Sequence, residues 1–253
     1  MASEFEIHKE IELEATPEQV WEAIATGPGI DSWFMGPHEV EPREGGAIKL
    51  AIPGSPEVGT VTGWDPPHRF AHRSIPGEDG SFHAFEFLVE GRDGGTCVLR
   101  FVHSGRAGDD WSDEFEAMTG HGWDMYLFTL SEYVKYFPGR FATYITANGP
   151  QASAEKEAWP VLERGLGLTG PVSQGDHIRL TPGGFDPIEG VVDYVEPGHF
   201  IGVRADDAMY RFHGLSLIGM PIAAGHHIFR EIDPVATAQA WETWMHRLFP
   251  ASE

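Results

Sequence analysis

The chain contains an internal repeat, and this repeat restricts the folds open to it more than any other feature. Residues 45–50 read GGAIKL and residues 175–180 read GDHIRL, which places the second segment 130 positions after the first. Residues 59–70 read GTVTGWDPPHRF, and residues 190–200 carry the same motif, one residue shorter, as GVVDYVEPGHF. Both segments have the pattern strand, turn, strand, and the common offset is far longer than the roughly 20–50 residues of a solenoid repeat. The sequence therefore predicts two copies of one domain fold, joined in tandem.

Length, composition and charge agree with two domains and exclude several classes of partner. The chain has 253 residues, 41% of them hydrophobic, so two halves of roughly 120 residues can each bury a core. A formal net charge of −22 disfavours nucleic acid and anionic membranes, because both are bound by basic patches. One cysteine and no zinc-ligand spacing predict neither a disulfide nor a metal site, and no cofactor is expected. Without an export signal or a membrane-length apolar run, we expect a cytoplasmic protein.

The order of predicted elements is the same in both halves. Alternation over 5–13 predicts a strand, and Thr16, Pro17 and Gln19 predict a helix start. The first half should continue with a second short helix at 30–35, strands at 47–52, 58–64, 69–74, 83–90 and 96–103, and a long amphipathic helix at 112–137. The second half should have a strand at 141–146, a helix at 153–165, strands within 175–231 and a closing helix at 234–249. We therefore expect one domain at 1–138 and a second, shorter domain at 139–253.

This order is that of an α+β helix-grip fold, in which a curved antiparallel sheet wraps around a long C-terminal helix. Several segments also match a known family, namely ATPEQVW at 15–21, SWF at 32–34, Gly59 and Val61 with DPP at 65–67, and Gly122 and Trp123 with Leu127, Leu130 and Tyr133. The chain resembles the START-like (SRPBCC) superfamily, in particular bacterial proteins related to the C-terminal domain of the heat-shock-protein ATPase activator. The resemblance implies an apolar cavity that binds lipids, polyketides or hormones, and in a minority of members catalyses cyclisation or dehydration.

Strand alternation identifies candidate residues for such a cavity in the first domain. If phenylalanines mark the inward face of each strand, period-two counting places His72, His83 and His103 on that face. The alternatives are that some of these histidines lie at strand ends in solvent, or that the register differs by one residue. A zinc site is less expected, since three strand histidines need convergent geometry. The candidate ligand-binding residues are His72, His83, Phe85, Phe87, Phe101, His103, Met118, Gly122, Trp123 and Tyr126.

Three classes of function fit these residues. We favour binding or sequestration of an apolar small molecule, such as a polyketide, lipid or aromatic metabolite, including self-resistance to a natural product. A cyclase or dehydratase that uses the inward histidines is the second class, but no catalytic motif is present and no catalytic residue is assigned. A co-chaperone-like interaction module is the third. The cavity should belong to the first domain alone, because the closing helix of the shorter second domain carries Trp241 and Trp244.

Overall fold

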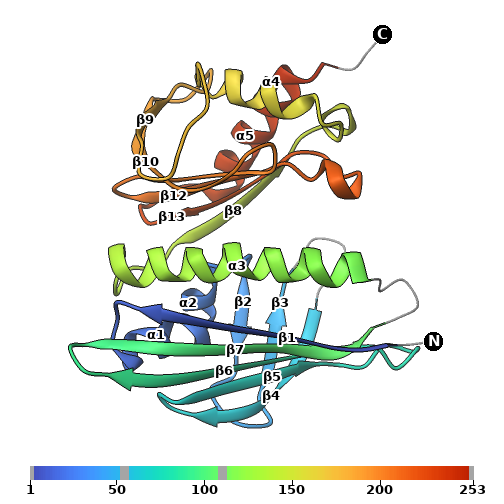
Figure 1. Cartoon of the computed structure of the whole chain (residues 1–253), viewed down its shortest axis with the longest axis vertical. Helices are drawn as coiled ribbons and strands as arrows, with labels where there is room; N and C mark the ends of the chain where they lie inside the picture. Colours follow the sequence, from blue (N-terminus) through green and yellow to red (C-terminus); the bar gives the residue numbers. More distant parts are fainter. Residues whose placement is uncertain (1–2, 52–56, 108–112, 251–253) are drawn as a thin grey trace. The chain divides into compact units, whose positions relative to one another are not determined.

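The computed structural model describes residues 3–51, 57–107 and 113–250, and the chain divides into two compact units (Figure 1). Unit 1 comprises Met1–Phe141 and unit 2 comprises Ala142–Glu253. Each unit contains one antiparallel sheet, of seven strands in unit 1 and six in unit 2, together with helices. The protein is therefore an α+β chain with two helix-grip units. No helix in the described ranges is long and apolar enough to cross a membrane.

Unit 1 is a curved sheet with one long helix along its face. Its sheet order is β1-β7-β6-β5-β4-β3-β2. α3 lies along the sheet (Figure 1), α1 contacts both α3 and the sheet, and α2 contacts α1 and β2. The elements are β1 (Ser3–Leu13), α1 (Pro17–Ala25), α2 (Gly27–Asp31), β2 (His38–Val40), β3 (Ala47–Leu50), β4 (Glu57–Asp65), β5 (Arg69–Ser74), β6 (Phe82–Arg92), β7 (Thr96–Ala107) and α3 (Asp113–Tyr136).

The first helix begins as the sequence predicts, but the second does not. Thr16 Oγ1 accepts from the backbone N–H of Gln19, and the Gln19 side chain accepts from Thr16 N–H, which forms a capping box. The glycine–proline–glycine segment at 27–29, expected to precede a helix at 30–35, instead forms the first turn of α2. Thr26 caps it by accepting from Gly29 N–H at 3.1 Å, and proline suits a first turn because its missing N–H needs no partner there.

Unit 2 has the same plan in shortened form. Its sheet order is β8-β13-β12-β11-β10-β9, and the region predicted as one helix at 153–165 consists of a 3₁₀ turn and α4. The elements are β8 (Thr143–Asn148), η1 (Gln151–Ser153), α4 (Ala158–Gly165), β9 (His177–Leu180), β10 (Ile188–Glu196), β11 (Phe200–Arg204), β12 (Ala208–His213), η2 (Ser216–Ile218), β13 (Ala223–Ile228) and α5 (Pro234–Leu248).

The two units share a β-bulge and the hydrogen bonds around it. In the β4–β5 pair the register shifts between Val61 and Gly63, and in the β10–β11 pair it shifts between Val192 and Tyr194. Gly45 N–H donates to the Val61 carbonyl at 2.8 Å, and Gly175 N–H donates to the Val192 carbonyl at 2.8 Å. Both of these glycines have positive φ, 74° and 94°, a conformation that glycine adopts without steric cost. The repeated bulge and turn confirm the predicted tandem duplication.

The core of unit 2 is filled by aromatic rings that pack around Trp241. The Phe185 ring stacks on Trp241 with centroids 4.1 Å apart, and the buried His226 ring lies edge-on to it at 4.7 Å. Phe212 and Tyr210 complete the group at 5.7 Å and 6.2 Å from Trp241. In the part of unit 2 that the structure describes, these side chains occupy the space between the sheet and α5.

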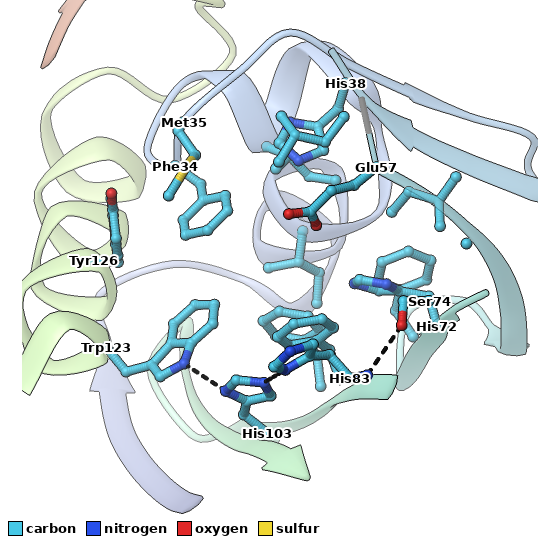
Figure 2. A pocket seen from close by; sticks show the side chains of 18 of the residues that line it. Phe34, Met35, His38, Glu57, His72, Ser74, His83, His103, Trp123 and Tyr126 are labelled. Atoms are coloured by element: carbon cyan, nitrogen blue, oxygen red, sulfur yellow. Dashed lines mark hydrogen bonds between the residues drawn. The ribbon is translucent and has the colours of Figure 1, made fainter. Parts of the chain in front are cut away.

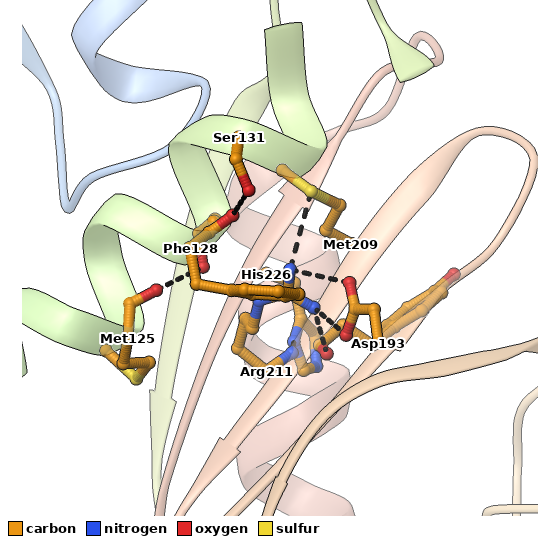
Figure 3. Close-up of polar contacts among 9 residues, drawn as sticks. Met125, Phe128, Ser131, Asp193, Met209, Arg211 and His226 are labelled. Carbon is orange, nitrogen blue, oxygen red and sulfur yellow. Dashed lines mark hydrogen bonds and ion pairs between the residues drawn. The ribbon is translucent and has the colours of Figure 1, made fainter. Parts of the chain in front are cut away.

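Unit 2 also contains a buried ion pair that crosses a strand. Arg211 on β12 donates to the two carboxylate oxygens of Asp193 on β10, at 3.0 Å and 2.8 Å (Figure 3). Gly202 lies on β11 between them, and a Cβ there would be 2.6 Å from Asp193 Oδ1 and 2.9 Å from an Arg211 nitrogen. The side chains of Arg211 and Asp193 are only 3% and 2% exposed. Glycine therefore allows a bidentate pair to pass over the middle strand.

Candidate functional site

Unit 1 encloses a cavity of 430 Å³ between the sheet, the two short helices and α3. Its walls are mainly aliphatic and aromatic side chains from all of these elements. The apolar lining residues are Ile24, Ile30, Trp33, Phe34, Met35, Ile48, Leu50, Val58, Phe70, Phe85, Phe87 and Trp123. This volume lies within the roughly 300–1,000 Å³ that is typical of small-molecule sites, and such sites are mostly apolar with a few placed polar groups.

The polar lining residues are grouped and carry little charge. They are Thr119 and, labelled in Figure 2, His38, Glu57, His72, Ser74, His83, His103 and Tyr126. Glu57 is the single carboxylate among the lining residues that the structure describes, and no lysine or arginine is among them. Charge complementarity in this cavity therefore does not favour an anionic ligand.

Three side chains from α3, β7 and β6 form a hydrogen-bonded chain along the cavity wall. The Trp123 indole N–H donates to His103 Nδ1 at 3.0 Å, and His103 Nε2 is 2.9 Å from His83 Nδ1 (Figure 2). The backbone N–H of His83 donates to Ser74 Oγ at 3.0 Å, and this bond fixes β6 against the end of β5. The ring of Phe85 stacks on His103 with centroids 4.4 Å apart. These contacts hold both imidazoles in defined orientations.

Burial favours the uncharged form of three cavity histidines, His72, His83 and His103. Burial, with smaller contributions from the neighbouring His83 and His72, lowers the pKa of His103 to about 3. Burial, with a smaller contribution from His38, also lowers the pKa of His72 to about 3. The pKa of His83 is lowered by burial, against the opposing effect of Glu57. Removing an imidazolium from water is costly, so the neutral ring is the stable form.

Several cavity residues were not predicted from the sequence, and two of them, His38 and Glu57, are titratable. His38 lies on β2, a strand of three residues, which is too short for alternation to be recognised. Its Nδ1 is 2.8 Å from Asp31 Oδ1, and its backbone N–H donates to the same oxygen at 2.9 Å. Glu57 begins β4 and lines the cavity from the sheet. No spacing or motif around either residue indicated a role.

Most of the predicted ligand-binding residues line this cavity. His72, His83, Phe85, Phe87, His103, Gly122, Trp123 and Tyr126 all do so. Phe101 has the predicted inward parity but lies behind the wall, 1% exposed, with its ring 4.3 Å from that of Trp123. The side chain of Met118 lies outside the described residues. Whether this set binds a ligand remains a prediction.

Gly122 widens the cavity at the middle of α3. A Cβ built at this glycine would meet no atom within 4 Å, so the space beside it is open. Next to it, Trp123 stacks on Phe34 with centroids 5.4 Å apart, and Phe34 is edge-on to Tyr126 at 4.5 Å. A mid-helix glycine costs about 1 kcal/mol of helix stability relative to alanine, and here the missing side chain leaves room in an aromatic site.

Unit 2 retains a related histidine but uses it differently. His226 pairs with Ile145 in the β13–β8 ladder, as His103 pairs with Ile7 in the β7–β1 ladder. His226 Nδ1, however, accepts from the backbone N–H of Arg211 at 3.1 Å rather than from an indole. Its ring is packed among the aromatic side chains of the unit 2 core. The hydrogen-bonded chain is therefore a feature of unit 1.

Among the residues that the structure describes, no group of three or more histidine, cysteine or acidic side chains is arranged to hold a metal ion. A curved antiparallel sheet, two short helices and a long helix that closes over a cavity define unit 1 as a helix-grip fold. Residues 14–135 match the model of the family described as activator of Hsp90 ATPase homolog 1-like protein.

Solved structures with similarity to the chain include one- and two-domain proteins. The Aha1 dimer from Colwellia psychrerythraea is 21% identical, with 51% of this chain and 95% of that chain covered and a TM-score of 0.43. A Bacillus halodurans protein is 27% identical over 51% of this chain and 93% of its own, with a TM-score of 0.40. The di-domain ARO/CYC BexL from the BE-7585A biosynthetic pathway is 14% identical over 98% of this chain and 100% of its own, with a TM-score of 0.47. No match was found among curated proteins.

Proposed function

We propose that unit 1 binds or sequesters an uncharged, mainly aromatic small molecule in its cavity. The observation that carries this proposal is a volume of 430 Å³ with apolar and aromatic walls and a small group of oriented polar side chains. Apolar walls supply affinity at about 25 cal/mol per Å² of surface removed from water. The polar groups supply orientation. Sequestration of an aromatic natural product, such as a polyketide, is the form of this function that suits these walls.

The electrostatics of the histidines favour binding over catalysis. A general acid or base works best when its pKa lies near the operating pH. The pKa values of His72 and His103 are lowered to about 3, so at neutral pH these rings act as hydrogen-bonding groups. We therefore propose no catalytic residue. A co-chaperone role has only the family description in its favour, and we do not propose it.

Native mass spectrometry of the purified full-length chain tests this function most directly. We expect a co-purified small molecule, seen as excess mass that organic solvent releases. In a second step, thermal stabilisation by 2-acetonaphthone, a neutral bicyclic ketone, should appear in the wild type and be absent from Gly122→Leu. Ala240→Leu on α5 is the matched control. Ala240 is exposed and directly precedes Trp241, just as Gly122 directly precedes Trp123. If no neutral aromatic compound stabilises the wild type, the proposed function is wrong.

A further inference from the structure

The ring of His38 lies between a carboxylate and the cavity. His38 Nδ1 is 2.8 Å from Asp31 Oδ1, and the backbone N–H of His38 donates to the same oxygen at 2.9 Å. A carboxylate accepts hydrogen bonds and cannot donate one, so the proton of the side-chain bond is on Nδ1. In the neutral ring the other nitrogen, Nε2, then carries no proton. Asp31 therefore makes His38 Nε2 a hydrogen-bond acceptor.

The edge of this ring that carries Nε2 is turned toward the cavity. His38 is a lining residue, whereas Asp31, which faces Nδ1, is not. The two nitrogens of an imidazole point away from each other, on either side of the carbon between them. Figure 2 shows the His38 side chain at the end of the pocket opposite Trp123 and His103. The acceptor therefore faces a part of the cavity that the hydrogen-bonded chain does not reach.

This acceptor is buried and has no partner within the protein. The His38 side chain is 6% exposed. Its Nδ1 and its backbone N–H both bond to Asp31, and Nε2 has no hydrogen-bond partner among the residues that the structure describes. The wall beside it is aromatic, since the ring of Phe34 is 6.0 Å from that of His38. A buried acceptor without a donor is unfavourable, so a ligand that brings a donor to Nε2 is preferred.

Gly36 makes the contact between Asp31 and His38 possible. A Cβ at this position would overlap Asp31 Oδ1 and lie 2.7 Å from Asp31 Cγ, and all the atoms it meets belong to the Asp31 side chain. Any larger residue at position 36 would therefore push the carboxylate away from His38. The glycine provides a way to disturb the pair while both of its members stay in the chain.

We propose that His38 Nε2 accepts a hydrogen bond from a hydroxyl group of the aromatic ligand, and that Asp31 is the positioning residue that holds His38 in this tautomer. This inference rests on the proposed function and narrows it to a chemical class, the hydroxylated aromatic compounds. A neutral phenol supplies both the ring that the walls bind and the donor that Nε2 lacks. A ligand of the same shape with a methyl group in place of the hydroxyl has no donor.

Two ligands of nearly equal shape test the inference on the full-length protein. 2-Naphthol carries the donor, and 2-methylnaphthalene has a methyl group in its place. Because the methyl compound is the more hydrophobic, the quantity to compare between wild type and variants is the ratio of its Kd to that of 2-naphthol. Isothermal titration calorimetry, at a pH well below the pKa of the phenol, measures both constants.

His38→Phe keeps an aromatic side chain and removes the acceptor. One neutral hydrogen bond corresponds to about a 3- to 10-fold difference in Kd, so we expect the ratio to fall by this factor in the variant. His177→Phe is the matched control, because His177 is exposed on β9 of unit 2, and it should leave the ratio unchanged.

A spectroscopic readout that needs no ligand tests the tautomer itself. Long-range ¹H–¹⁵N correlation spectra distinguish a protonated ring nitrogen from a bare one. At mildly alkaline pH we expect a proton on His38 Nδ1 and none on Nε2 in the wild type. Gly36→Ala should give a mixture of tautomers at His38 and lower the Kd ratio. Gly183→Ala, where a Cβ meets no atom within 4 Å, is the control and should change neither quantity.

The outcomes separate this inference from the proposed function. An equal Kd ratio in the wild type and His38→Phe, or a proton on His38 Nε2 in the wild type, would overturn the inference and leave the proposed function standing. An unchanged tautomer in Gly36→Ala would overturn the role of Asp31. If neither naphthalene compound binds the wild type, both the proposed function and the inference are wrong.

Discussion

Replacing Gly122 by leucine should stabilise the protein while it abolishes ligand binding. The position is in the middle of α3, and a Cβ there meets no atom within 4 Å. A Cβ at this position is therefore accommodated without movement of its neighbours. It also gains nearly 1 kcal/mol of helix propensity over glycine. The new side chain points into a cavity of 430 Å³, and burial of a leucine side chain is worth up to about 1.5–3 kcal/mol.

The sum of these terms gives an increase of about 1–4 kcal/mol in the free energy of unfolding, depending on how much of the leucine is buried. In the same variant the leucine occupies the space that an aromatic ring would take. Saturating 2-acetonaphthone, at 100 times its Kd, should stabilise the wild type by about 2.7 kcal/mol and Gly122→Leu by a negligible amount. Gly122→Leu should therefore gain stability and lose ligand binding. This trade-off is expected for a residue that keeps a binding site open.

Urea denaturation followed by far-UV circular dichroism, with and without 2-acetonaphthone, measures both quantities. Ala240→Leu adds the same type of side chain to an exposed position of α5 and should leave the effect of the ligand unchanged. A destabilised Gly122→Leu would show that the space beside Gly122 is not open. Full stabilisation of Gly122→Leu by the ketone would place the binding site elsewhere.

Three further predictions concern stability. Acidification from pH 7.5 to 5 should lower the free energy of unfolding by about 2 kcal/mol for each of His72 and His103. Their pKa values in the folded protein are about 3, so the unfolded chain binds more protons than the folded one between pH 6.5 and 3. A urea midpoint that is unchanged at pH 5 would contradict this prediction. Asp193→Asn leaves the buried Arg211 guanidinium without its counter-charge and should lower the free energy of unfolding by about 3–5 kcal/mol. Glu189→Gln, in an exposed pair with Arg179, should lower it by less than about 1 kcal/mol in the same denaturation assay. Thr16→Ala removes the α1 cap and should lower stability by about 1 kcal/mol; a thermal midpoint equal to that of the wild type would argue against the cap.

The elements with regular periodicity could be predicted from the sequence, and those defined by a few residues could not. Alternation predicted the strand at 69–74 with the bounds that β5 has in the structure, Arg69–Ser74. The segment at 27–29 was misread because proline and glycine end some helices and begin others. The deciding contact is the bond from Gly29 N–H to Thr26. β2 has three residues, fewer than a period-two pattern needs.

In the candidate site, the side of the sheet on which a residue lies could be predicted from the sequence, but the contacts between elements could not. Parity placed three histidines on one face of the sheet, but the contact between His83 and His103 depends on the β6–β7 register, in which Phe85 lies opposite His103. That register is set by long-range pairing and not by local sequence. The indole that completes the chain comes from α3, whose rotation against the sheet is a matter of packing. The positions of His38 and Glu57 at the cavity depend on the same tertiary contacts.

Among the lining residues that the structure describes there is no lysine or arginine, which makes the ionisation of the bound compound itself important. Burial lowers the pKa of His72 and His103 to about 3, so these two rings stay uncharged across the ordinary pH range. For a phenolic or carboxylic compound, entry is then favoured below the pKa of the compound, and departure is favoured above it. Capture and release of such a compound would follow its own acid–base chemistry, without a conformational change in the protein.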